Sequence, residues 1–446
     1  MPKHLTPAFL TLSFAFTFFV TRAYSQQAEI PQLAPADGGA NTADQTDSAG
    51  TTRIVEERPD LYWIGKNLHP ISWFEFVVRP VAHMAERGAN RFNYQQQSTK
   101  VWGVKFGISG NGTSSGAGPE IKPFHNDLFG TGLQLELPLV VTYRLYESYR
   151  FRLNYPLIRS EGVPGEDSER LGVEFSGRYN SRPSETFYGI GNDISDVNNT
   201  KFRSVSRTAG IALKARVGKA WTLRLEEGYR SIGITEPRNY ISSKDVFANS
   251  GIPGMSDAGG TGLISTISVQ RDTKDRNYLA SSGGRQYIEV SLNEGLTGGD
   301  FSYWRYRAGL QQFFSLDEHH RKVIAFRTDV ETNQEKGGSV IPFFDLPIIG
   351  SHSTVRGIPT RRYTDKSSMS ASLEYRYRIW RAFDWGFFVD TGQVGPQIGD
   401  FSFSKDRLHT GYGTRFMVRA GKHAMSIDLA RSREGWAIYA DFSPDF

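Results

Sequence analysis

The chain offers few residues that are typical of catalysis. The letters Gly-x-Ser-x-Gly at 112–116 match a hydrolase nucleophile motif centred on Ser114, but that motif needs a buried strand leading into a helix. Here it is surrounded by Ser, Gly, Asn and Thr, which predict a polar loop. His319 and His320 lie between two predicted strands, as expected of a turn. We therefore expect no enzyme, no metal site and no cofactor.

Charged residues that could form ion pairs are more informative about this chain than the candidate catalytic residues. The stretch 349–359 predicts a long loop that contains Val355, Arg356 and Gly357. A guanidinium group stays charged and presents a planar fork to carboxylates, so one arginine can fix both the position and the orientation of a loop. We expect Arg356 to anchor this loop. Arg356 then either only makes the loop rigid, or it holds a loop that gates the lumen or braces a lateral seam.

A strand of unusual polarity, predicted over 370–380, follows this loop. One face is apolar and the other is charged: Leu373, Tyr375, Tyr377 and Ile379 alternate with Glu374, Arg376 and Arg378. Such a strand fits a wall with hydrocarbon on one side and a wet lumen on the other.

The same period-two alternation recurs from about residue 101 to the end, in about sixteen segments. One of them, 133–143, predicts a single strand. Short connections, as at 217–219, alternate with long ones, as at 231–260 and 331–369. We therefore predict an all-β fold, a transmembrane antiparallel β-barrel of about 16 strands. An even strand number places both chain ends on the periplasmic side and 331–369 outside. A soluble propeller or sandwich is the disfavoured alternative.

Composition agrees with a barrel. Hydrophobic residues make up 38% of the 446 residues, too few for a bundle of spanning helices, whereas 13% aromatic residues and 46 glycines suit β-structure with aromatic girdles. The net charge is +5, but the arginines are spread along strands, so we expect no nucleic-acid partner. The absence of cysteine excludes disulfides and thiolate metal sites.

The N-terminal region predicts export, which together with the predicted barrel indicates the bacterial outer membrane. Residues 1–25 resemble a signal peptide, with an apolar run over 8–20 and cleavage near Ser25. Residues 26–52 predict a disordered linker, and 53–100 predict a lead-in or plug segment. Residues 101–446 form the expected barrel.

The motif Val355-Arg356-Gly357 resembles that of the BamA/TamA-type bacterial surface antigen superfamily. The resemblance implies that the sixth outer loop folds into the lumen, where Arg356 pairs with acids on the next two strands. Glu374 matches the first position, and Asp390, which follows Phe388, matches the second. The stretches 187–192 and 271–272 also resemble family features. The resemblance assigns an assembly signal to the terminal aromatic strand: Trp436, Ile438, Phe442 and Phe446.

The sequence departs from the family pattern in three places. Ile358 stands where the family has an aromatic residue, and Pro444 lies in the terminal strand. Between Gln26 and Val101 there is room for at most one of the periplasmic POTRA domains that usually precede the barrel. We therefore expect a member without POTRA domains.

The resemblance implies a role in assisting the insertion or translocation of protein or lipid. The expected partners are outer-membrane lipid, a protein or lipid client, and a separate periplasmic partner. A gated or passive pore, or a structural barrel, is the alternative. An outer-membrane hydrolase is a third possibility, with Ser114 as its candidate.

Overall fold

The computed structural model describes residues 101–109, 116, 118–160, 169–195, 199–238, 240–255, 259–297, 301–380, 382–420 and 423–442. They lie within one of the two compact units of the chain, Leu68–Phe446. The predicted signal peptide, linker and lead-in segment lie outside the described residues. So do Ser114, Pro444 and Phe446.

The described residues are almost entirely strands, and 17 of these form one sheet. The strands are β1 (Trp102–Ser109), β2 (Gly118–Leu128), β3 (Leu133–Glu136), β4 (Leu139–Val141), β5 (Glu147–Arg159), β6 (Glu169–Phe187), β7 (Thr200–Val217), β8 (Trp221–Thr235), β9 (Gly259–Asp272), β10 (Gly283–Thr297), β11 (Tyr303–Ser315), β12 (Lys322–Glu335), β15 (Ser367–Trp380), β16 (Phe383–Gly395), β17 (His409–Ala420), β18 (His423–Ser432) and β19 (Gly435–Phe442). The loops add a two-stranded sheet, β13 (Ile348–Ile349) with β14 (Tyr363–Thr364), a short helix, α5 (Ser243–Phe247), and two 3₁₀ turns, η3 (Phe343–Asp345) and η4 (Ile398–Asp400).

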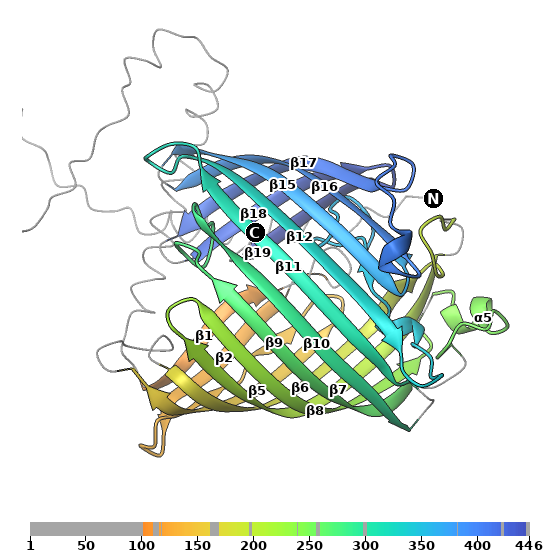
Figure 1. Ribbon diagram of the computed structural model, residues 1–446, viewed down its shortest axis with the longest axis horizontal. Helices are drawn as coiled ribbons and strands as arrows, with labels where there is room; N and C mark the ends of the chain where they lie inside the picture. Colours follow the sequence, from red (N-terminus) through yellow and green to blue (C-terminus); the bar gives the residue numbers. More distant parts are fainter. Residues whose placement is uncertain are drawn as a thin grey trace, which may run out of the picture. The chain divides into compact units, whose positions relative to one another are not determined.

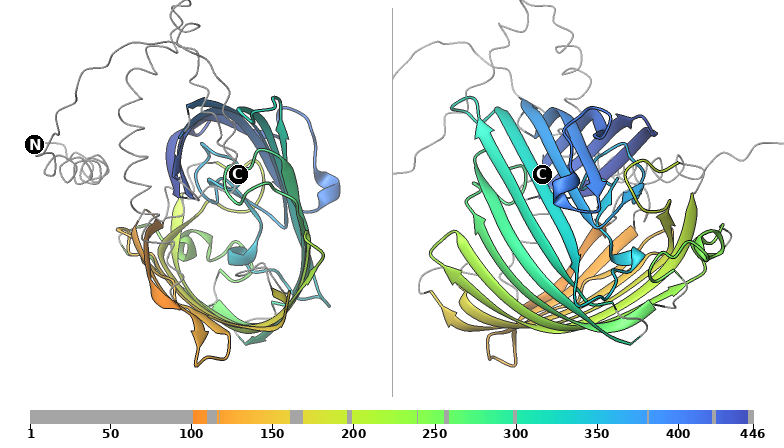
Figure 2. Two further views of the ribbon diagram at one scale, coloured as in Figure 1. Left: turned by 90° about the vertical axis from the view of Figure 1, so that its left-hand side faces the viewer. Right: turned by 45° about the vertical axis from the view of Figure 1, so that its right-hand side comes forward.

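Strands that lie side by side in the sheet pair antiparallel, and the sheet curls into a barrel (Figures 1 and 2). Cα atoms of the first and last strands, β1 and β19, come within 8 Å of each other. No hydrogen-bonded pairing joins these two strands within the part of the chain that the structure describes. The all-β barrel prediction is confirmed.

The prediction of one strand over 133–143 is wrong. The structure divides it into β3 and β4 at Leu137 and Pro138, and the second part already ends at Val141. Proline has no N–H to donate to a strand ladder, which explains the break at this point. Both parts lie between β2 and β5, so the 17 strands occupy sixteen positions in the sheet.

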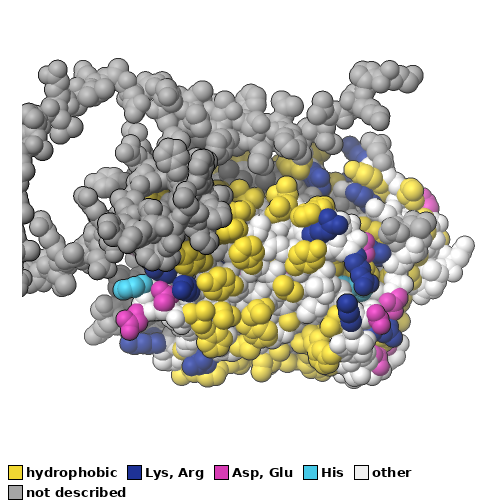
Figure 3. All heavy atoms as spheres, turned by 90° about the horizontal axis from the view of Figure 1, so that it is seen from above, with side chains coloured by type: hydrophobic (Ala, Val, Ile, Leu, Met, Phe, Trp, Pro, Cys, Tyr) yellow, Lys and Arg dark blue, Asp and Glu magenta, His cyan; other side chains and the backbone are white. Residues whose placement is uncertain are grey.

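The two faces of the wall differ as the alternation predicts. Along β15 and β16, Leu373 and Phe387 are more than half exposed on the outside, whereas Glu374 and Asp390 are fully buried inside. In surface view, hydrophobic side chains cover the middle of the molecule and charged side chains gather toward both ends (Figure 3). No described helix is long and apolar enough to cross a membrane.

The connection 336–366 between β12 and β15 is the sixth on its side of the barrel; we call it the sixth loop. It lies inside the ring of strands, coloured cyan to light blue in Figure 2. Its Gly357 N–H donates to the hydroxyl of Tyr439 on β19, 3.0 Å away, and its Arg356 reaches β15, β16 and β18. The expected inward fold of this loop is confirmed.

The polarity of the wall makes a testable prediction at two adjacent residues of β9. Ile267 is 56% exposed on the outer face, whereas Ser268 faces inward between Arg224 and Glu289. We expect Ile267→Arg to lower the free energy of unfolding by about 2–4 kcal/mol, because the charge meets hydrocarbon. Ser268→Arg is the matched control and should cost less than half as much. Denaturant unfolding in lipid vesicles measures both, and equal costs would contradict the assignment of faces.

Candidate functional site

The sixth loop approaches the wall closely enough that a side chain on the facing strand would prevent it. An added Cβ at Gly411 on β17 would lie 1.9 Å from the carbonyl oxygen of Arg356. Gly357 itself has φ +87°, a conformation that glycine adopts without strain. These two glycines place the Arg356 backbone directly against β17 and aim its side chain at the neighbouring strands.

The guanidinium group of Arg356 forms a two-point contact with Asp390 on β16. Its Nε donates to Oδ2 at 2.7 Å and its Nη2 to Oδ1 at 2.8 Å, and the Arg356 backbone N–H also donates to Oδ2 at 3.0 Å. Ser372 on β15 donates to the same carboxylate at 2.6 Å. The planar fork is therefore fixed in both position and direction.

Two further acids complete the environment of Arg356. Nη1 lies 3.0 Å from Asp428 on β18 and 3.4 Å from Glu374 on β15. Arg415 on β17 binds Asp428 through two contacts of 2.6 Å and reaches Glu374 at 3.1 Å. Arg376 binds Glu374 at 2.6 Å. We call the six residues the anchor cluster: Arg356, Arg376, Arg415, Glu374, Asp390 and Asp428.

The anchor cluster is buried and balanced in charge. None of its six residues is more than 3% exposed, and three guanidinium groups face three carboxylates. Burial acts to lower the pKa of Arg356, but Asp390, Glu374 and Asp428 outweigh it and hold the pKa above its ordinary value. Arg356 is therefore held in its charged form.

Apolar contacts hold the loop on either side of the guanidinium group. Arg356 stacks on Phe388, with Cζ 3.4 Å from the ring centre. Val355 is fully buried with Ile349, Tyr363 and Ile358. Ile358, which departs from the family pattern, therefore packs in this cluster as an aliphatic residue.

The sixth loop has a second attachment near its start, on other strands. Asp345 forms a two-point ion pair with Arg230 on β8, and its carbonyl oxygen accepts from Arg305 on β11 at 2.9 Å and from Asn333 on β12 at 3.0 Å. Burial acts to raise the pKa of Asp345, but Arg230 outweighs it and lowers that pKa. The loop is therefore attached to separate regions of the barrel wall through Arg356 and through Asp345.

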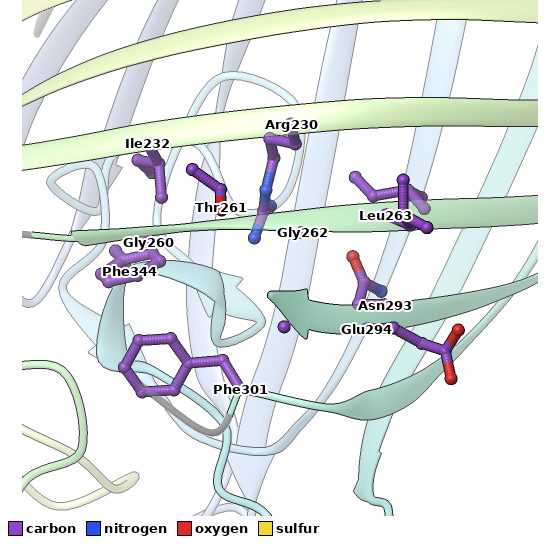
Figure 4. A pocket seen from close by; sticks show the side chains of 12 residues that line it. Arg230, Ile232, Gly260, Thr261, Gly262, Leu263, Asn293, Glu294, Phe301 and Phe344 are labelled. Atoms are coloured by element: carbon purple, nitrogen blue, oxygen red, sulfur yellow. The ribbon is translucent and has the colours of Figure 1, made fainter. Parts of the chain in front are cut away.

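An apolar cluster surrounds this second attachment. Phe343 and Phe344 of the loop pack with Phe187, Phe202 and Tyr303, which come from three different strands. Figure 4 shows Arg230, Phe301 and Phe344 around a pocket beside the loop. These aromatic contacts make the start of the loop part of a packed core inside the lumen.

The stretch 187–192 connects the sixth loop to other outer loops. Gly191 donates to the carbonyl oxygen of Thr364 at 2.7 Å, and the Asn192 amide bridges the Val394 N–H and the Arg407 carbonyl oxygen, both at 2.9 Å. Gly189 and Gly191 both have positive φ, so glycine suits this tight path. The family-like stretch thus lies beside the loop that carries Arg356.

The structure brings Val355, Arg356, Gly357, Glu374, Phe388 and Asp390 together in one site. Sequence reasoning missed Asp428 and Arg415. The signal was present, because the apolar residues of β17 and β18 alternate and leave these two on the inner face. The predicted assembly-signal residues Trp436 and Ile438 are exposed on the outer face of β19, whereas the side chain of Phe442 is outside the described part.

The chain was compared with known protein families and solved structures. Residues 127–434 match the model of the Omp85 superfamily domain. The fold is similar to that of BamA from Haemophilus ducreyi lacking POTRA domains 1–3, with 14% identity, a TM-score of 0.56, and coverage of 78% of this chain and 70% of that chain. CdiB from Acinetobacter baumannii matches at 12% identity and TM-score 0.46, over 77% of this chain and 65% of that one. CdiB from Escherichia coli matches at 9% identity and TM-score 0.48, over 80% and 69%.

The anchor cluster predicts the effect of removing its central cation. Arg356→Ala leaves three buried carboxylates with two guanidinium groups, so we expect a loss of about 3–5 kcal/mol and a folded gel band that is less resistant to heat. Protease should also cut 336–366 faster. Arg356→Lys keeps the charge but loses the fork, so its effect should be intermediate. An unchanged band and unchanged cleavage in Arg356→Ala would contradict the anchoring role.

A second prediction concerns the close approach at β17. Gly411→Ala places a methyl group 1.9 Å from the Arg356 carbonyl oxygen, so we expect the loop to shift and its cleavage by protease to increase. Gly399→Ala is the control, because an added Cβ there meets nothing within 4 Å. If both variants resist protease equally, the loop does not depend on this contact.

Proposed function

The chain belongs to the Omp85 superfamily, and from this premise we propose that it assists the insertion or translocation of a protein or lipid client across the outer membrane. Membership of this family supports placement in the bacterial outer membrane, with a fold shared by transporters and insertases. The insertion or translocation activity itself is the proposed step.

The observation that carries the proposal is the anchored sixth loop. A loop held inside the barrel by six buried charges occupies space that a permanently open pore would need free. Its attachments through Asp345 and Arg356 lie on different strands, so release of the loop requires both of them to break. This arrangement supports a controlled route for a client rather than a passive channel.

The meeting of β1 and β19 supports a route through the wall. Every other pair of neighbouring strands is hydrogen-bonded, whereas these two come within 8 Å without pairing in the described residues. A strand edge with unpaired N–H and C=O groups can accept an incoming strand. A client that forms strands, such as another barrel, suits this seam.

The proposal assigns roles to the remaining predicted features. Arg356 with Glu374 and Asp390 fixes the loop, and Trp436, Ile438, Phe442 and Phe446 serve as an assembly signal. Residues 1–25 direct export with cleavage near Ser25. A separate periplasmic partner would deliver the client. Outer-membrane lipid surrounds the apolar face.

Liposomes containing the full purified chain test the proposal. We expect unfolded eight-stranded barrels to insert several-fold faster into these liposomes than into empty ones, and Arg356→Ala to reduce the acceleration. Arg407→Gln is the control, because its ion pair with Asp193 is exposed on the outer loops. No acceleration, together with a large steady current in planar bilayers, would favour a passive pore instead.

A further inference from the structure

Two arginines stand directly opposite each other on the barrel wall. Arg150 on β5 and Arg178 on β6 are paired residues in the strand register, and both side chains are exposed. Side chains in such a pair start about 5 Å apart, and like charges directly opposite each other destabilise a sheet. This pair therefore costs stability unless something negative lies between the two groups.

Both arginines face the lumen. Tyr149 and Tyr179, their neighbours in sequence, stack on the outer face with ring centres 5.7 Å apart. Successive side chains of a strand point to opposite faces, so Arg178 points inward. It shares a row of the sheet with Thr208 and with Arg230, which contacts the sixth loop inside the barrel.

Other arginines on this part of the wall have acidic partners. Arg182 binds Glu185 at 2.6 Å, and Arg224 binds Glu174 and Glu226, both at 2.9 Å. Arg152 lies 3.5 Å from both Glu136 and Glu174. Within the described part of the chain, Arg150 and Arg178 have no such partner, and the nearby carboxylates are already engaged.

The next row toward the outer end contributes neutral polar groups. Ser148 donates to the amide oxygen of Asn180 at 2.9 Å, and the Asn180 amide nitrogen lies 3.4 Å from the hydroxyl of Ser206. Across β5, β6 and β7 these two rows hold two arginines, three hydroxyl residues and one asparagine, with no carboxylate. The result is a basic surface lined with hydrogen-bonding groups.

We propose that Arg150 and Arg178, with Thr208 and the Ser148–Asn180–Ser206 row, form a lumenal binding site for a phosphate group. Two guanidinium groups match the double charge and tetrahedral oxygens of a phosphate monoester or a pyrophosphate better than the single charge of a carboxylate. The bound anion removes the repulsion between the two arginines. The site goes beyond client insertion, because it recognises a phosphorylated molecule within the lumen.

Calorimetric titration of the purified full chain in detergent with inorganic pyrophosphate tests the site. We expect saturable binding that raises Tm by about 2–4 °C near saturation. Arg150→Gln and Arg178→Gln should each weaken binding by about tenfold or more. Without pyrophosphate, neither variant should lower Tm, because each removes a like-charge contact. Folding of the variants is therefore preserved.

Matched controls separate specific binding from screening. Arg276→Gln removes one positive charge from the connection between β9 and β10, where Arg276 pairs with Asp275, and should bind as the wild type does. Sodium chloride at equal ionic strength should not reproduce the shift in Tm. A pyrophosphate effect that is equally large in Arg178→Gln would overturn the site.

The source of the phosphate is resolved by a second titrant. Micelles doped with phosphatidic acid present the same phosphate group on a lipid. A response to pyrophosphate assigns the site to soluble phosphorylated molecules, and a response to phosphatidic acid alone assigns it to lipid headgroups. Either response must disappear in Arg178→Gln. The absence of a response to both titrants would exclude a phosphate site.

Discussion

The position of the sixth loop depends on the rule that a buried guanidinium group must be met by carboxylates. Removing a charged group from water costs several kcal/mol, and only a close set of opposite charges offsets that cost. Arg356 finds such a set where β15, β16 and β18 contribute one acid each. The absence of a side chain at Gly411 allows the approach. The position and the direction of the loop tip therefore follow from one interaction, the ion pairing of Arg356 with three carboxylates.

Much of the fold was predictable because a barrel wall has only two environments. Leu373 and Glu374 are neighbours in sequence and lie on opposite faces, as a period of two requires. The break at Pro138 followed from the missing N–H, yet alternation alone did not reveal it, because the apolar pattern continues through it. The local sequence pattern therefore predicted the two faces of each strand and the order of the strands, whereas the chemistry of the proline backbone decided where one strand ends.

The site was only partly predictable. The resemblance supplied Glu374 and Asp390, but Asp428 and Arg415 lie on strands far along the chain, and their meeting with Arg356 depends on register and barrel curvature. The attachment of Asp345 to Arg230 joins residues from β8 and from a loop more than a hundred positions later. No local sequence pattern marks that pair. Such contacts depend on the curvature of the whole sheet around the loop.

The hydrogen bond from Gly357 to Tyr439 has a thermodynamic consequence. It joins the loop tip to β19, the strand at one edge of the seam, and Ser432 adds a second bond to the Gly357 carbonyl oxygen. If displacement of β19 weakens these bonds, the loop and the seam share a coupling free energy, and coupling is reciprocal. A molecule that holds the loop in place then stabilises β19 in its position at the seam. A molecule that pairs with a displaced β19 weakens the attachment of the loop by the same factor.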